Sequence, residues 1–589
     1  MEVNIKPLLF PLIFKYSIMI TTALFFTLQL VGFTTAIGRG SLSSSSSSGA
    51  KMGQWKILLK STGVVGMHMA LTHHNTVLMF DQTESGRSGY LLHGRKRGRK
   101  YGGIRCSYSD VNDSSCWAHS VEYDIAANSI RPLRLETDTW CSSGAFLSNG
   151  TLLQTGGHGN GYRRIRYFRP CSNHRCSWTQ SRHSLVNNRW YSSNQRLPSA
   201  KDRVIVVGGK DTFSYEFVPK LSHSDERSFA LPFLHKTYNR REDGNNLYPF
   251  LHLSSDGKLF IFANRDSILL DYKRDKVIKT YPRMPGGGSR NYPSSGSSVM
   301  LPLDHKDGFQ KVEVMVCGGS SSGAYEAAQQ GTHLKGLSTC GRMVITGHNH
   351  KWVMEHMPGP RLLNDMLILP TGQILIINGA KHGCAGWNNA ANPSLQPYLY
   401  NPKKRWGHRF SVLKSAKIAR LYHSSAILLP DGRVLVAGGN PNRHYTFKNV
   451  AFPTELRLQA FTPYYMERHY HNIRPSNVSI NHKHSRRDRL DSTIGYGKEF
   501  TVRFRLRRKP SKVVNFNVYA PPFTTHSISM NQRMLKLRCR RMVREKDGWI
   551  NAVIEAPPSA NVAPSGYYML TVVNEGIPSL SHWVRFDHV

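Results

Sequence analysis

Residues 429–439 read LPDGRVLVAGG. A polar turn is followed by a short run of apolar, mostly β-branched residues and then by a glycine pair. Such a run is typical of a buried β-strand, and glycines at its end permit a tight turn or a close approach of two backbones. The segment therefore predicts a strand inside a densely packed β-sheet.

The same pattern returns along most of the chain. Related runs occupy residues 77–81, 152–157, 204–209, 259–262, 314–319 and 374–379. After a longer first gap, which contains Cys106, Cys116 and a basic insertion from His93 to Lys100, they recur roughly every 50 to 60 residues, near the kelch period. One four-stranded blade cannot bury both faces, so the blades must stack in a ring. The repeat predicts an all-β fold with a seven-bladed kelch-type β-propeller over residues 53–470. The alternative is an unrelated β-sandwich with accidental spacing.

The last part of the chain has a different pattern. The stretch His482 to Asp491 is basic and polar, like a linker. Apolar residues then alternate with polar ones in Phe500–Phe504 and Val513–Val518, and Tyr567–Val573 forms another strand-like run. Short strands over about 100 residues are typical of a small β-sandwich, which we assign to residues 471–589.

The N-terminus indicates the cellular route. Residues 1–36 combine two lysines with the uncharged stretch SIMITTALFFTLQLVGF and small residues after it, as in a signal peptide. The apolar stretch is long, so an uncleaved signal anchor is the alternative. A serine-rich linker follows at residues 37–52. We expect a secreted glycoprotein of the extracellular space or cell wall, with glycosylation sequons at Asn112, Asn149 and Asn477.

Charge and cysteines limit the partners. The 589 residues carry a formal net charge of +41 and include nine cysteines. A secreted chain rarely meets nucleic acid, so we expect the positive charge to face an acidic cell-wall polysaccharide and expect no nucleic-acid partner; the alternative is a solvated charged face without a partner. An oxidising compartment favours disulfides, and Cys171 with Cys176 is the best candidate pair. We expect a monomer that does not associate with a membrane once the signal is cleaved.

Four segments carry candidate site residues. They contain Cys141, Tyr191, the pair Tyr422-His423, and His526. The first three segments each lie a few residues before a repeat motif, so they should occupy equivalent blade positions and converge around the channel. Tyrosine oxygens and histidine nitrogens there would suit Cu(II). The pattern equally fits buried tyrosines with bonded hydroxyls and a core histidine.

At these residues the sequence resembles the galactose oxidase and glyoxal oxidase family of secreted copper radical oxidases, especially its plant glyoxal oxidase-like branch. The resemblance runs from Trp55 to Phe586. Its most specific parts are Ala419–Ala426 running into Leu429–Arg433, Thr139–Ser142 and Arg189–Tyr191. The segments Asn378–Ala380 and Ala385–Trp387 add to it.

The resemblance implies a propeller with a C-terminal immunoglobulin-like domain and one copper ion. Tyr191 would be an equatorial ligand, cross-linked through sulfur to Cys141 to hold the radical. Tyr422 would be the axial ligand and the base for the substrate proton. The two equatorial histidines would be His423 and His526, the latter carried by a loop of the C-terminal domain. Two-electron oxidation at one copper needs this second one-electron store.

Three functions follow. The first is an aldehyde oxidase of the glyoxal or methylglyoxal type, which makes carboxylic acids and reduces O2 to H2O2. The second is a primary alcohol or galactose-type oxidase, and the third a non-catalytic kelch protein that binds the cell wall. Two departures from the family occur, at Pro198–Asp202 in place of a Pro-Asp-Gly turn and at Gln459 in place of glutamate. If Cys141 forms the thioether, eight cysteines remain for disulfides, and Cys384 and Cys539 are candidates to stay free.

Overall fold

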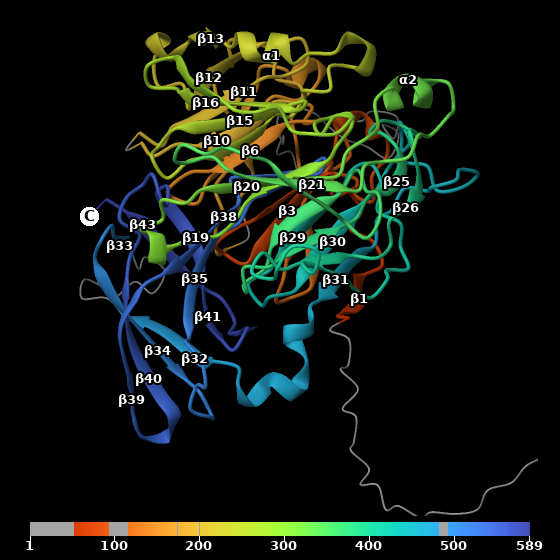
Figure 1. Ribbon diagram of the computed structural model, residues 1–589. Coiled ribbons are helices and arrows are strands. Elements are labelled where there is room, and N and C mark those ends of the chain that lie inside the picture. The colour runs from red at the N-terminus through yellow and green to blue at the C-terminus, as the bar shows by residue number, and fades with distance from the viewer. Residues whose placement is uncertain (1–51, 93–115, 174, 200, 482–492, 589) are drawn as a thin grey trace, which may run out of the picture. The chain divides into compact units, whose positions relative to one another are not determined.

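The computed structural model describes residues 52–92, 116–173, 175–199, 201–481 and 493–588 (Figure 1). The chain divides into two units, residues 1–50 and 51–589, and all described residues belong to the second. The expected signal segment, nearly all of the serine-rich linker, the basic insertion at 93–100 and the linker at 482–491 lie outside the described residues. Among the described helices, none combines the length and apolar character needed to cross a membrane.

Seven antiparallel blades of four strands follow one another along the chain, the first extended to a six-stranded sheet by a hairpin from later in the chain, and they confirm the predicted propeller (Figure 1). The first three contain β2 (His68–Leu71), β3 (Thr76–Phe80), β4 (Ser120–Asp124) and β5 (Ser129–Leu133); β6 (Ser143–Phe146), β7 (Leu152–Thr155), β8 (Ile165–Phe168) and β9 (Trp178–Gln180); β10 (Ser193–Arg196), β11 (Val204–Val207), β12 (Ser214–Val218) and β13 (Ser228–Ala230). The next two contain β14 (Phe250–Leu253), β15 (Leu259–Ala263), β16 (Asp266–Asp271) and β17 (Lys276–Thr280); β18 (Ser297–Met300), β20 (Glu313–Cys317), β21 (Thr339–Val344) and β22 (Val353–His356). The last two contain β23 (Asp365–Ile368), β24 (Ile374–Ile377), β27 (Tyr398–Tyr400) and β28 (Phe410–Val412); β29 (Ser424–Leu428), β30 (Val434–Gly438), β31 (Leu458–Thr462) and β1 (Gln54–Leu59).

The blades close into a ring. The first strands of neighbouring blades touch in the pairs β6–β10, β10–β14, β18–β23, β23–β29 and β29–β2, so these strands line the axis. Strand β1 comes from the start of the described chain but pairs with β31, which completes the seventh blade. The two ends of the propeller segment are therefore joined by hydrogen bonds, and the ring leaves no open edge between its first and last blades.

The repeated apolar runs form the second strand of each blade, counted from the axis. Strands β11, β24 and β30, for example, are buried along their whole length. Their side chains meet neighbouring blades on both faces, which explains why the runs are apolar without alternation. The strands at the axis are more polar, as Ser193 and Asn194 in β10 illustrate. These innermost strands carry the site.

In four blades a buried arginine ties the turn after the second strand to the loop that enters the same blade. The Nη1 of Arg189 donates to the carbonyl oxygen of Gly208 at 2.8 Å, and that of Arg420 donates to Gly438 at 2.6 Å. Arg290 and Arg361 make the equivalent bonds to Gly318 and Asn378. The Nη2 of Arg420 also donates to Gln459, so the amide that replaces the expected glutamate still provides an acceptor.

A β-sandwich follows the propeller. One sheet contains β32 (Ser476–Asn481), β34 (Glu499–Arg505), β40 (Trp549–Glu555) and β39 (Cys539–Arg544). The other contains β19 (Leu303–Asp304), β38 (Arg533–Leu537), β35 (Asn515–Ala520), β41 (Gly566–Asn574), β43 (His582–Asp587), β33 (Thr493–Gly495) and β42 (Ile577–Pro578). Strand β19 comes from the propeller segment and pairs in parallel with β38, which joins the two parts.

Three smaller features complete the fold. A hairpin of β36 (Phe523–Thr525) and β37 (Ile528–Met530) leaves the sandwich, and β36 pairs with β2 of the first blade. A second hairpin consists of β25 (Ala380–Gly383) and β26 (Ala390–Pro393), and the described α-helices are α1 (Pro232–Lys236) and α2 (Ala324–Gln329). Disulfides join Cys171 to Cys176, as predicted, and Cys317 to Cys340. Cys116 is also disulfide-bonded, whereas Cys141, Cys384 and Cys539 are free thiols.

Candidate metal centre

Three of the predicted site residues occupy one repeated position in the blades. Cys141 and Tyr191 lie two residues before Ser143 and Ser193, which pair with Thr155 and Val207 just ahead of the glycine turns. His423 stands at the same place in the seventh blade, two residues before Ser425. All three have left-handed backbone, with φ of 53°, 64° and 61°. The fold thus brings to the axis three side chains that are far apart in the sequence.

His526 reaches the axis by a different route. It forms the turn between β36 and β37, and this hairpin touches the innermost strands β6, β29, β18 and β23. His526 and Ser527 both have positive φ, 45° and 70°, which makes the turn tight. Thr525 lies beside the ring, with its Oγ1 at 2.6 Å from His526 Nδ1. That contact leaves Nε2 directed at the other site residues.

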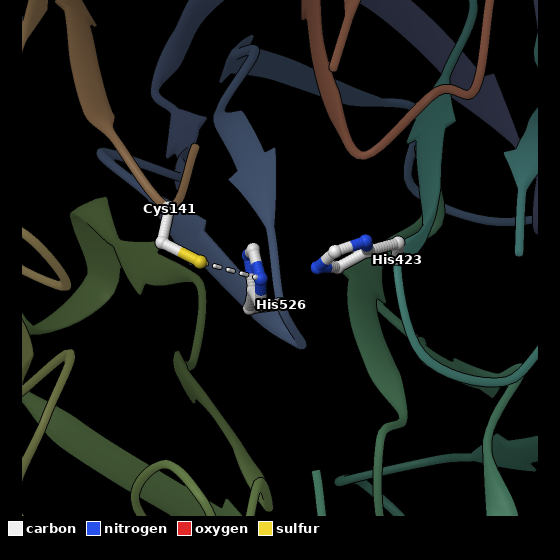
Figure 2. Close-up of side chains that lie close together, drawn as sticks. All are labelled: Cys141, His423 and His526. Carbon is white, nitrogen blue, oxygen red and sulfur yellow. Dashed lines mark hydrogen bonds between the residues drawn. The ribbon is translucent and has the colours of Figure 1, made fainter. Parts of the chain in front are cut away.

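Cys141, His423 and His526 form a buried cluster (Figure 2). One ligand atom from each lies within 4.8 Å of the others, and Cys141 Sγ is 3.2 Å from His526 Nε2. The rings of His423 and His526 have centroids 5.0 Å apart and stand nearly perpendicular, at 79°. Within the described ranges this is the one group of three or more such residues close enough to hold a metal ion.

The two predicted tyrosines complete the group through a third tyrosine. The hydroxyl of Tyr292 lies 3.0 Å from that of Tyr191 and 2.9 Å from that of Tyr422. Tyr422 also packs on the neighbouring ring of His423 at 3.9 Å. The backbone N–H of Tyr191 donates to the carbonyl of Cys141 at 3.0 Å, which holds these two residues side by side. All five predicted residues therefore lie together at one place.

Burial sets the protonation states. It lowers the pKa of His423 and of His526 well below the ordinary imidazole value, and nearby histidines lower it further. Burial also raises the pKa of Tyr191, Tyr422 and the Cys141 thiol well above their ordinary values. The imidazoles are therefore neutral, which is the form that binds metals, and the phenols keep their protons until a cation displaces them.

The donor set fits a metal ion. Both ring nitrogens of His423 are buried, and neither has a hydrogen-bond partner among the residues that the structure describes. A buried polar atom without a partner is costly, and a ligand that binds it removes that cost. Two imidazoles and two phenols are donors of the kind that Cu(II) prefers. The residues present thus suit copper.

Sequence reasoning missed several neighbours of this cluster. Tyr248 lies at the same blade position as Tyr191, with φ of 50°, and donates its hydroxyl hydrogen to the Ser142 carbonyl at 3.0 Å. The blade register could have identified it. Tyr292 stands outside that position, so the repeat gave no signal for it. His68 in β2 was also missed; its ring nitrogens lie 3.1 Å from Phe80 O and 3.1 Å from Ser142 Oγ, so both already have partners.

Comparison with protein families agrees with this arrangement. Residues 67–465 match the model of the glyoxal oxidase N-terminus, and residues 484–586 match the galactose oxidase-like early set domain. The chain belongs to the glyoxal oxidase family. The first match spans the propeller strands from β2 to β31 and includes four of the five predicted site residues. The second covers most of the sandwich and contains His526.

Curated relatives and a solved structure extend the comparison. This glyoxal oxidase family member is 41% identical to "Aldehyde oxidase GLOX" of Vitis pseudoreticulata over 90% of this chain and 97% of that protein. It is 41% identical to "Aldehyde oxidase GLOX1" of Arabidopsis thaliana over 90% of this chain and 84% of that protein. A copper-bound fungal alcohol oxidase of the AA5 family superposes with a TM-score of 0.66 at 17% identity, covering 91% and 99% of the two chains. At that identity the superposition shows a shared fold.

Proposed function

We propose that this protein is a copper-dependent oxidase that converts aldehydes of the glyoxal or methylglyoxal type to carboxylic acids. The observation that carries the proposal is the buried group of two phenols, two neutral imidazoles and one thiol at the propeller axis. The names of two plant relatives that match 90% of the chain support aldehydes as substrates. The hydrated aldehyde would lose two electrons and two protons, which O2 would take up to form H2O2.

Tyr191, Tyr422, His423 and His526 are the proposed ligands of one copper ion. When bound, copper would act as a Lewis acid for the substrate oxygen and as a one-electron acceptor. Cys141 is the proposed thioether partner of Tyr191, because its backbone carbonyl accepts from Tyr191 N–H and its thiol is free. Forming that bond removes one hydrogen from the thiol and one from the ring, and O2 is the oxidant that would accept them.

The chain's own groups would divide the remaining work. The phenol oxygen of Tyr422 would accept the proton of the substrate hydroxyl, and Tyr191 would store one electron equivalent as a radical. Tyr292 links the two phenol oxygens and would hold their separation. Complete burial of both phenols would protect the radical from water and reductants, since Tyr191 is 4% and Tyr422 2% exposed.

Mass spectrometry tests the cofactor. Tryptic digestion of the copper-loaded protein should release one cross-linked species joining the peptides of Cys141 and Tyr191, two hydrogens lighter than their sum. Metal analysis should find one copper per chain. Two separate peptides of unmodified mass after copper loading would contradict the radical mechanism and favour the non-catalytic wall-binding alternative.

A peroxide-release assay tests the substrate. Glyoxal and methylglyoxal should each release H2O2 faster than galactose or a simple primary alcohol does. Preference for galactose would instead support the galactose-type alternative. The carboxylic acid formed should match the H2O2 in amount, because each turnover transfers two electrons.

A secreted monomer held against an acidic cell-wall polysaccharide is the partner arrangement that we propose. The sandwich supports it, because β39 presents Arg540, Arg541 and Arg544 on an exposed strand, and Arg507 and Arg508 are exposed nearby. Exposed charges of this kind act through screened electrostatics, so binding to polygalacturonate should be lost at moderate salt. Retention that does not change with salt would contradict it.

A further inference from the structure

Three tryptophans that the sequence motifs contain lie in one continuous stack beside Tyr191. The ring of Trp190 contacts Tyr191 with centroids 4.7 Å apart, and Trp140 contacts Trp190 at 5.0 Å. Trp387 then stacks on Trp140 at 5.1 Å with an interplanar angle of 18°. These spacings are those of rings in direct contact. The proposed catalytic group uses none of the three.

The stack leads from the buried site toward the surface. Tyr191 is buried, the neighbouring Trp190 is partly buried, Trp140 is 9% exposed, and Trp387 is again partly buried. Trp387 lies in the turn between β25 and β26. The exposed guanidinium of Arg443 lies 5.9 Å from the Trp387 ring centroid. A positive charge therefore lies beside Trp387, and a second lies beside Trp190, where Lys210 Nζ is 5.2 Å from the ring centroid.

The indole nitrogens point to a specific use. The Nε1 atoms of Trp140, Trp190 and Trp387 are all buried; those of Trp140 and Trp387 have no hydrogen-bond partner in the described part of the chain, and that of Trp190 faces the Cys141 thiol. An oxidised indole usually passes its N–H proton to an acceptor. Where no acceptor is present the proton stays, so the ring can give and regain an electron without moving a proton. Indole is also one of the most easily oxidised side chains.

We propose that Trp190, Trp140 and Trp387 form an electron-transfer route between Tyr191 and one-electron oxidants at the surface. One electron leaves Tyr191, crosses the three rings in turn and reduces a small anionic oxidant that Arg443 attracts to Trp387. With copper bound, Tyr191 would already be a phenolate, so giving one electron to the oxidant leaves a neutral radical and the step balances without a proton. The inference rests on the proposed function, because it needs a radical on Tyr191.

Stopped-flow spectroscopy of the copper-loaded full-length protein tests the route. Ferricyanide is the oxidant, and the growing absorption band of the tyrosyl radical gives the rate constant. Trp387→Phe keeps an aromatic ring but removes the oxidisable indole. We expect the rate constant to fall at least tenfold while the final band keeps its wild-type amplitude.

Trp406→Phe is the matched control. Trp406 is 63% exposed, and its Nε1 donates to the Met354 carbonyl. It should leave the rate unchanged. A Trp387→Phe rate within twofold of wild type would overturn the route. A faster rate in Trp387→Phe would also overturn the route, because it would show that the tryptophans slow the oxidation of Tyr191 and shield its radical.

Arg443→Gln provides a second test at an exposed position, where folding is not at risk. It should slow oxidation by ferricyanide and leave oxidation by a cationic one-electron oxidant unchanged or faster. Equal rates with both oxidants would contradict an entry point at Trp387. Absence of any radical band in the wild-type protein would refute the proposed function itself, which separates that failure from failure of the route.

Discussion

Tyr292→Phe removes one hydroxyl that lies 3.0 Å from Tyr191 and 2.9 Å from Tyr422. A hydrogen bond to a charged acceptor contributes about 1.5–3 kcal/mol, and one between neutral groups about 0.5–1.5 kcal/mol. A reduced, metal-bound Tyr191 is an anion and its radical is neutral, so the bond stabilises the reduced form by about 1–1.5 kcal/mol more. Its loss should lower the reduction potential of the Tyr191 radical by roughly 40–60 mV, since 59 mV corresponds to a tenfold change for one electron. The Tyr292 hydroxyl has one hydrogen, which it can donate to Tyr191 or to Tyr422. If the two phenol oxygens accept it equally, the shift in the reduction potential should be about half as large.

A redox titration that follows the radical absorption of the copper-loaded protein measures this potential. Tyr248→Phe is the control, because Tyr248 also stands against the Tyr191 ring, at 5.6 Å, but donates its hydroxyl hydrogen to the Ser142 carbonyl. It should leave the potential nearly unchanged. An unchanged potential in Tyr292→Phe, or equal shifts in the two variants, would refute the argument that the hydroxyl acts through the phenol oxygens.

Three further predictions concern stability and the cofactor. Burial raises the pKa of Asp81 to about 7. The native state therefore keeps a proton that the unfolded chain releases near pH 4. This proton uptake adds to the free energy of unfolding at low pH, and the contribution is lost as pH rises from about 4 to 7. Thermal unfolding should therefore show a higher midpoint at pH 5 than at pH 7.5, and Asp81→Asn, which resembles the protonated acid, should reduce that difference; an unaltered difference would contradict it. Cys141→Ser should abolish the cross-linked peptide yet retain one copper per chain, whereas loss of copper would show that the thiol itself is a ligand. Gly318→Ala would place a Cβ 2.4 Å from the Arg361 carbonyl oxygen. It should lower the free energy of unfolding by about 1–3 kcal/mol more than Gly331→Ala, whose Cβ would meet nothing within 4 Å at a similar φ. Equal urea unfolding midpoints of the two variants would count against the close approach.

Much of the architecture could be predicted because the propeller is a repeat. Each blade contains an apolar second strand, which ends in a glycine turn in five of the seven blades, and that combination is visible in the sequence wherever it occurs. The same register explains why Cys141, Tyr191 and His423 could be placed together without a structure. The repeat could not place His526 with them, because it comes from a hairpin of the sandwich and has no counterpart in the blades; only the family resemblance gave it a role.

The missed residues have a physical explanation. Tyr292 enters the site from the loop ahead of β18, three residues before the equivalent blade position at Ser295, so no spacing rule indicates its direction. The stack of Trp190, Trp140 and Trp387 joins two blades and the β25–β26 turn. Its existence depends on how adjacent blades pack, which the motifs of single blades do not contain.

Backbone conformation gives an independent argument that the cluster is functional. Cys141, Tyr191, His423 and His526 all have positive φ. A left-handed conformation costs a residue with a side chain about 1–2 kcal/mol, which glycine avoids. The first blade has Gly66 at the equivalent position without a positive φ, so the ring does not require the left-handed conformation in every blade. Side chains at the other positions therefore need a reason beyond the stability of the ring.

The residue at this left-handed position differs among the blades. Ser295 and Leu363 share the left-handed position, with φ of 46° and 56°, but neither has a side chain that commonly binds copper. Cysteine, tyrosine and histidine occupy the equivalent places in the second, third and seventh blades, and Tyr248, whose hydroxyl is bonded to the Ser142 carbonyl, occupies it in the fourth. The propeller thus provides one repeated, strained position at the axis. In the proposed mechanism, the chemistry depends on which blades carry donor side chains there and on the histidine that the sandwich hairpin adds from outside the repeat.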